Sequence, residues 1–292
     1  MTDNIDMSIP DSILSSWGHH YSGTAPKQAH VSIRNAIAKY KGWAEKPDYD
    51  VFLQGSYKND TNLRQDSDVD VVIQLAVRLR PRVAALSGLE LEQDQAHKFT
   101  REIWQSFRKQ VLEALRDTYG KKAVTPRRKS LKLAKGKIPA SADVVVTLHY
   151  ETGLAFYLPK DHRWVVSYPQ QHHERGLKKE KATNNMYKRT IRMFKVARNH
   201  LVENNVIKSK TASSYFIECL LYNVPNDLFK ANFGQTYSGI VAYLKNADLK
   251  HFKSQNGVRQ LFGQSKDLWN VDEAKKFVLA LEQMWKRWPN LA

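Results

Sequence analysis

Cysteine is almost absent from this sequence of 292 residues, which contains Cys219 and no other. A single cysteine excludes an internal disulfide, a zinc cluster with several thiolates and a Cys-Cys redox pair. We therefore expect a reducing compartment. Cys219 lies in the apolar run FIECLLYNV, which predicts a core residue rather than a nucleophile.

Long apolar runs are also missing. No segment approaches the roughly 18 consecutive apolar residues of a membrane span, and the first twenty residues do not show a basic region followed by an apolar run. We expect a cytoplasmic protein with no membrane partner. Hydrophobic residues still make up 42% of the chain, which is enough to bury the core of one large domain or of two packed lobes.

Acidic residues are fewer than basic ones, and the formal net charge is +17. A positive field of this size attracts phosphates, whether on nucleoside triphosphates, on nucleic acid or on anionic lipid. Charge alone does not choose among these partners. An RNA-binding protein therefore remains one interpretation.

The hydrophobic pattern predicts an α+β fold in which a mixed, helix-flanked sheet is followed by helices. Helical spacing is found over residues 26–44 and 93–119. Strands rich in β-branched residues are predicted within 48–59 and 66–77, and further strands at 129–134, 142–150, 154–158 and 164–166.

After Pro169 the pattern becomes helical. Thr183, Thr211 and Asn270 are placed to cap helices, and the charged run 175–183 is expected to be a mobile connection. We therefore predict one lobe over residues 1–168 and a helical lobe over residues 169–292.

Asp68 and Asp70 stand at the start of a predicted strand in DSDVDVVIQL. Side chains alternate along a strand, so both carboxylates project from the same face. Two neighbouring negative charges favour a bound Mg²⁺ or Mn²⁺, since both ions prefer oxygen ligands. A solvated turn is the alternative, because such a pair is common in surface loops.

Two further features favour the metal site. Gly55-Ser56 ends a predicted strand, where glycine allows close approach to a phosphate and the serine hydroxyl can donate to it. Asp143 opens another strand, DVVVTLHY, and is expected to meet the other two aspartates at one edge. Three carboxylates beside a phosphate-binding turn predict phosphoryl transfer assisted by two metal ions.

The segments GSYKNDTNLRQDSDVDVVIQL and ADVVV resemble the polymerase-beta nucleotidyltransferase signature. More narrowly, they are similar to the CD-NTases, bacterial relatives of cyclic GMP-AMP synthase and oligoadenylate synthase. The resemblance extends over most of residues 50–225, and its later segments, such as SSYFIECLLYNVP, look closest to the CdnE branch.

The resemblance implies roles for the residues that match. Gly55 and Ser56 correspond to the turn that grips the donor triphosphate, Asp68 and Asp70 to ligands shared by both metals, and Asp143 to the acid that binds the catalytic metal.

Three helical residues match as well. Lys195 corresponds to a lysine on the donor phosphates, Ser214 to a phosphate-contacting serine, and Tyr215 to an aromatic that stacks on the donor base. Alternatively, Lys195 belongs to a solvated basic face with Lys188, Arg192 and Arg198, and Tyr215 is an ordinary core residue.

The implied activity joins two NTPs and then closes the product into a cyclic nucleotide. The implied partners are ATP, with UTP or another NTP, and an effector that senses the product in CBASS anti-phage defence; nucleic acid is not required. The rivals are a nucleotidyltransferase acting on RNA ends and an RNA-binding protein. Thr147, four residues after Asp143, is expected to face the acceptor base. His172-His173 is expected to be a surface pair.

Overall fold

The computed structural model describes residues 8–20, 23–63, 68–78, 89–264 and 268–290, with residues 89–96 described as backbone. The chain divides into two compact units. Within the described residues, the sheet unit comprises 23–59 and 68–169, and the helical unit comprises 8–20, 60–63 and 170–290. This division differs from the one expected at residue 168, since 8–20 and 60–63 pack with the helices.

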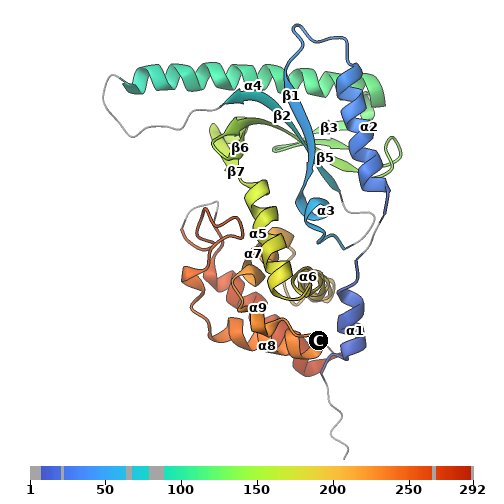
Figure 1. The fold of residues 1–292 in the computed structure, drawn as a ribbon, viewed down its shortest axis with the longest axis vertical. Coiled ribbons are helices and arrows are strands. Elements are labelled where there is room, and N and C mark those ends of the chain that lie inside the picture. Colours follow the sequence, from blue (N-terminus) through green and yellow to red (C-terminus); the bar gives the residue numbers. More distant parts are fainter. Residues whose placement is uncertain (1–7, 21–22, 64–67, 79–88, 265–267, 291–292) are drawn as a thin grey trace, which may run out of the picture. The chain divides into compact units, whose positions relative to one another are not determined.

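The sheet unit is built on one mixed seven-stranded sheet (Figure 1). Its main strand order is β1-β2-β5-β4-β3, while β6 pairs with β5 and β7. The pair β2-β5 is parallel and the other pairs are antiparallel. The strands are β1 (Tyr49–Gln54), β2 (Val69–Arg78), β3 (Val124–Pro126), β4 (Leu131–Leu133), β5 (Ala142–Tyr150), β6 (Gly153–Leu158) and β7 (Arg163–Ser167).

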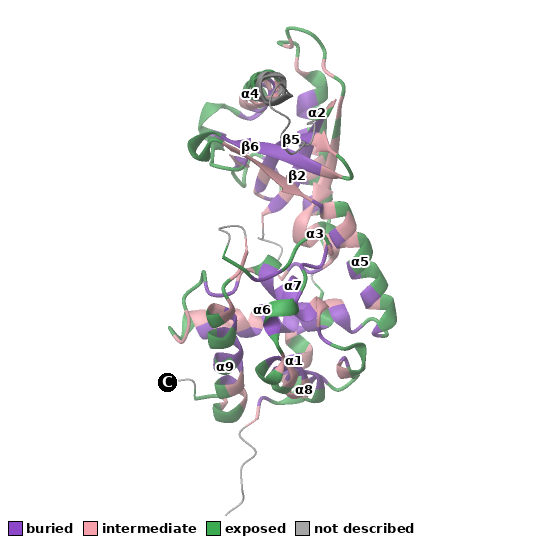
Figure 2. Ribbon diagram, turned by 90° about the vertical axis from the view of Figure 1, so that its left-hand side faces the viewer, coloured by how far each residue is buried: buried purple, intermediate pink, exposed green. Residues whose placement is uncertain are grey.

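Strand β5 is central, and most of its residues are buried (Figure 2). Its valines and those of β2 form the core of this unit together with apolar side chains of the helices. The helices of the sheet unit are α2 (Ala25–Lys39), α3 (Gly55–Asn59) and α4 (Leu89–Tyr119). The indole of Trp104 in α4 donates to the carbonyl of Val146 in β5 at 2.9 Å, which ties the long helix to the sheet.

The helical unit has its own core, which includes the fully buried Phe194, Phe216, Tyr237 and Phe277. Its helices are α1 (Asp11–Trp17), α5 (Pro169–Ala182), α6 (Tyr187–Glu203), α7 (Ser214–Tyr222), α8 (Phe233–Asn246) and α9 (Val271–Arg287). Short 3₁₀ helices occur at Asn226–Leu228 and Leu249–His251 in this unit, and at Lys121–Ala123 and Pro159–Asp161 in the sheet unit. In the described part of the chain, no helix combines the length and apolar character that crossing a membrane requires.

The structure confirms the α+β class and corrects details of the helical half. Most of the run 175–183 lies in α5 and is not a free connection. The α7 cap is Ser213 rather than Thr211, since the Ser213 hydroxyl accepts from the amide of Phe216. Asn270 caps α9 as predicted. The three-residue strand β3 and helix α8 were not predicted, although Phe233, Tyr237, Ile240 and Leu244 of α8 recur at helical spacing.

Candidate active site

Asp70 and Asp143 lie opposite one another on the two parallel strands of the sheet. The β2-β5 register pairs them directly, and each is the second residue of its strand. Neighbouring strands are about 4.8 Å apart, so paired side chains on one face are close neighbours. The backbone register therefore brings Asp143 next to Asp70, as the sequence predicts.

Gly55 lies against the Asp70 carboxylate. It follows β1, whose last residue, Gln54, pairs with Asp70. The φ angle of Gly55 is +69°, a left-handed conformation, and a Cβ built there would come within 2.0 Å of Asp70 Oδ2. Only glycine fits this position, because it tolerates the positive φ angle and has no Cβ to clash with the carboxylate. The expected turn is the start of α3, with the half-buried Ser56 as its second residue.

Asp68 stands just before β2, and its carboxylate is already engaged. Ser141 donates its hydroxyl to Oδ1 at 2.5 Å, and the ammonium of Lys132 in β4 forms an ion pair with Oδ2. Burial on its own raises the pKa of Asp68, but the hydrogen bonds from Lys132 and Ser141 outweigh it, and the net pKa is lowered. The carboxylate is therefore held in its charged form.

Asp143 has a partner of its own, because Ser130 donates its hydroxyl to Oδ1 at 2.9 Å. Among the residues that the structure describes, no three His, Cys, Asp or Glu side chains lie close enough together to hold one ion. The donor chemistry nevertheless fits Mg²⁺ or Mn²⁺, since Asp70 and Asp143 present oxygen ligands side by side. Asp68 would complete the set by turning away from Lys132.

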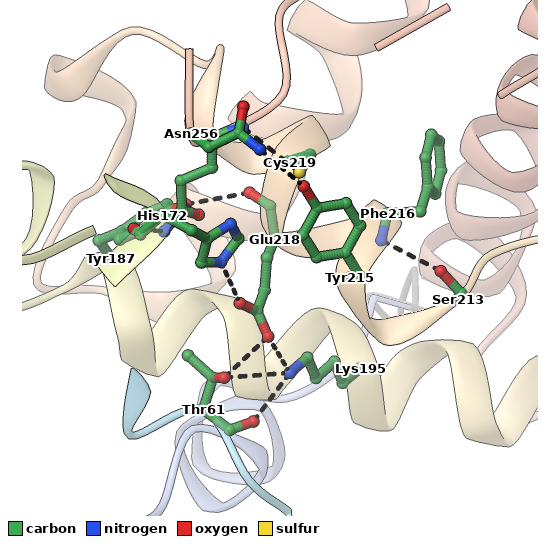
Figure 3. A network of polar contacts seen from close by, with 11 residues as sticks. Thr61, His172, Tyr187, Lys195, Ser213, Tyr215, Phe216, Glu218, Cys219 and Asn256 are labelled. Atoms are coloured by element: carbon green, nitrogen blue, oxygen red, sulfur yellow. Dashed lines mark hydrogen bonds and ion pairs between the residues drawn. The ribbon is translucent and has the colours of Figure 1, made fainter. Parts of the chain in front are cut away.

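Ser214 and Tyr215 occupy the first turn of α7 in the helical unit, and both are exposed. As a whole residue Tyr215 is 41% exposed, although its hydroxyl accepts from the side-chain amide of Asn256 at 3.4 Å. Its ring stacks on the His172 ring with centroids 5.2 Å apart (Figure 3). The Trp269 ring also lies near it, with centroids 5.8 Å apart, so aromatic neighbours hold the Tyr215 ring in place.

Lys195 lies inside the helical unit and is 1% exposed. Its ammonium donates to Glu218 Oε1 at 2.6 Å, and to the carbonyl and hydroxyl oxygens of Thr61 at 3.0 and 3.2 Å (Figure 3). These contacts match the three donors of an ammonium. To contact a phosphate, Lys195 would have to give up one of its hydrogen bonds to Glu218 or Thr61 and donate to a phosphate oxygen instead. The alternative of a solvated basic face is wrong, because Arg192 is also buried, at 3%.

His172 and Glu218 are the residues that sequence reasoning missed. His172 is 4% exposed, which corrects its expected place on the surface, and its Nε2 lies 2.8 Å from Glu218 Oε2. Burial opposes the charge on Glu218, but the nearby Lys195 and His172 lower its pKa to about 2. The available signal was one acidic residue inside an apolar helix, since a buried carboxylate requires a cationic partner.

Thr147 is not at the surface, where an acceptor base could reach it. Its side chain is fully buried within the sheet unit, and its hydroxyl has no hydrogen-bond partner among the described residues. The period-two rule correctly placed it on the strand face of Asp143. It did not reveal that this face becomes covered farther along β5, where Val145 is also buried.

Two family models match the chain. The cGAS/DncV-like nucleotidyltransferase C-terminal helical domain matches residues 174–286, and the nucleotidyltransferase domain matches residues 34–128. The two matches fall mainly on the helical unit and on the sheet unit, respectively.

Three curated relatives are similar over most of their length. The cyclic UMP-AMP synthase of Rhodothermus marinus is 41% identical over 97% of this chain and 99% of its own. The cyclic nucleotide synthase CdnE01 of Staphylococcus haemolyticus is 32% identical, covering 97% and 100%. The cyclic dipurine nucleotide synthase of Elizabethkingia meningoseptica is 32% identical, covering 88% and 90%.

A solved structure of the Rhodothermus marinus CdnE c-UMP-AMP synthase with Apcpp and Upnpp superposes with a TM-score of 0.84 at 40% identity, covering 97% of this chain and 98% of that one. Three observations support the same family: the similarity over almost the whole chain, the two domain matches, and the Asp70–Asp143 pair beside Gly55. The chain therefore belongs to the cGAS/DncV-like nucleotidyltransferases, the CD-NTases, and within them to the CdnE branch.

Proposed function

We propose that this enzyme makes a cyclic di- or oligonucleotide from NTPs by phosphoryl transfer with two Mg²⁺ or Mn²⁺ ions. The observation that carries the proposal is the cross-strand pair Asp70–Asp143 directly beside Gly55. The similarity to a cyclic UMP-AMP synthase supports it and favours ATP and UTP as substrates. Another relative is named as a cyclic dipurine nucleotide synthase, which indicates that the choice of nucleotide substrates varies among similar chains.

In the proposed reaction, Asp68, Asp70 and Asp143 would hold the ions, which would lower the pKa of the attacking hydroxyl and neutralise charge on the leaving pyrophosphate. The half-buried Ser56, next to Gly55, donates to the donor triphosphate. Asp143 orients the acceptor hydroxyl and accepts its proton. A second transfer within the linear intermediate closes the ring.

In the helical unit, we assign Tyr215 to the donor base and Ser214 to the donor phosphates. The exposure of both residues at the α7 start supports this assignment. The contact of Lys195 with phosphate remains a prediction that requires a rearranged Lys195. For the cell, we propose a cytoplasmic role in CBASS anti-phage defence, with a nucleotide-sensing effector as partner.

The test is incubation of the purified protein with each labelled NTP, singly and in pairs. We expect pyrophosphate release without a primer, a requirement for Mg²⁺ or Mn²⁺, and a main product that resists phosphatase because a ring has no terminal phosphate. A primer-dependent ladder of extended RNA would instead establish the RNA-end nucleotidyltransferase. Salt-dependent RNA binding without pyrophosphate release would favour the RNA-binding protein.

A further inference from the structure

Lys132 in β4 lies next to the aspartates Asp143 and Asp70 on the neighbouring strands of the sheet. The β4-β5 register pairs it with Asp143, which in turn pairs with Asp70 on β2. Its neighbours on β4, Leu131 and Leu133, are fully buried in the core. Because side chains alternate along a strand, Lys132 projects from the opposite face, where its side chain is 16% exposed.

The Lys132 ammonium is paired with Asp68. It contacts Oδ2, while the Ser141 hydroxyl donates to Oδ1, so both carboxylate oxygens are occupied by donors of the protein itself. A protonated lysine has three donors and no acceptor, and it cannot bind a metal ion. An ion that takes Asp68 as a ligand therefore competes with the Lys132 ammonium for the negative charge of this carboxylate.

We propose that Lys132 is a built-in competitor of the metal ion, which neutralises Asp68 and is displaced when the ion binds. The inference rests on the proposed two-metal site. Lys132 is a positioning residue here, because it acts through Asp68. Its presence makes metal binding weaker than the three carboxylates alone would allow, because part of the binding free energy goes into displacing the Lys132 ammonium from Asp68.

The pair could instead be ordinary sheet stabilisation, and the two interpretations predict opposite results for metal affinity. If Lys132 only braces the sheet, its removal loosens the site and Mn²⁺ binds equally well or more weakly. If Lys132 competes with the ion, its removal tightens Mn²⁺ binding although the protein without added metal becomes less stable.

The experiment is a titration of the full chain with Mn²⁺ in the presence of a non-hydrolysable ATP analogue. Electron paramagnetic resonance measures the concentration of free Mn²⁺, from which the binding affinity is obtained. We expect Lys132→Met to bind Mn²⁺ at least threefold more tightly than the parent protein. Lys132→Arg keeps the charge, and Lys137→Met removes the same charge from an exposed position beyond β4. Both should bind Mn²⁺ as the parent does.

The second readout is the thermal unfolding midpoint with and without Mn²⁺. Lys132→Met should unfold at a lower temperature than the parent without metal, and Mn²⁺ should raise its midpoint by more. If Lys132→Met does not fold, Lys132→Gln takes its place. Equal or weaker Mn²⁺ binding by the neutral variant overturns the competition, whereas a parent protein that binds no Mn²⁺ beyond the analogue alone overturns the metal site itself.

Discussion

Lys195 Nζ lies 2.6 Å from Glu218 Oε1, and both side chains are almost completely buried. The pair joins α6 to α7, and Thr61 completes it from the segment that follows α3. Burying two charges costs free energy that their attraction and hydrogen bonds must offset, so removal of Glu218 alone leaves the Lys195 ammonium buried without a counter-charge.

We therefore expect Glu218→Gln to lower the free energy of unfolding by on the order of 3–5 kcal/mol, because it leaves the Lys195 ammonium buried without a counter-charge. Urea denaturation at neutral pH measures the change. Glu203→Gln, the same substitution at an exposed position of α6, serves as the control. The double variant Lys195→Met with Glu218→Gln should recover part of the loss; additive losses would show that the two charges do not interact.

The pair also predicts how stability changes in acid. The pKa of Glu218 falls from 4.5 to about 2 on folding, so its stabilising effect is complete above pH 4.5. As the pH drops from 4.5 towards 2, the unfolded chain takes up the proton first and up to about 3 kcal/mol is lost. The stability difference between the parent and Glu218→Gln should therefore shrink between pH 5 and pH 3, and a constant difference would contradict the lowered pKa.

The metal site can be tested with substitutions that change side-chain charge but little volume. Asp68→Asn with Asp70→Asn should abolish nucleotide synthesis, because the change removes charge from the ion ligands but little volume. Pyrophosphate release measures activity, and circular dichroism verifies the fold. Full activity of the folded double variant in Mg²⁺ would exclude these aspartates as metal ligands.

Tyr215 should act through its ring. Tyr215→Ala should weaken binding of the donor nucleotide by on the order of 1–3 kcal/mol, whereas Tyr215→Phe should keep most of it, because stacking does not need the hydroxyl. Calorimetric titration with a non-hydrolysable NTP analogue provides the comparison. Equal affinity of the two folded variants would place the ring outside the donor site.

Thr147 provides a test of the corrected assignment. Thr147→Val keeps the β-branched shape and removes a buried hydroxyl that has no partner among the described residues. We expect the free energy of unfolding to rise by about 1 kcal/mol and the base composition of the product to stay the same. A changed preference among NTPs would restore Thr147 as a base-selecting residue.

Local patterns were enough to predict much of the fold. The apolar run of β5 predicted the strand over residues 142–150, and helical spacing predicted most of α4. The aspartates could be recognised because a charged residue at the start of an apolar strand stands out in the sequence alone. Their alternation also predicted that Asp68 and Asp70 share one face, and the position of Asp143 at the start of another strand predicted that it meets them.

Only the tertiary structure decided which partners the charged side chains meet. Thr61 and Glu218 are 157 positions apart, and Asp68 and Ser141 are 73 apart, so no local periodicity relates them. The choice of partners depends on how the strands pair and how the helices pack, because a buried charge selects whichever opposite charge the packing brings within reach. For this reason the aspartates could be predicted from the sequence, whereas Lys132 on Asp68 and the burial of Lys195 could not.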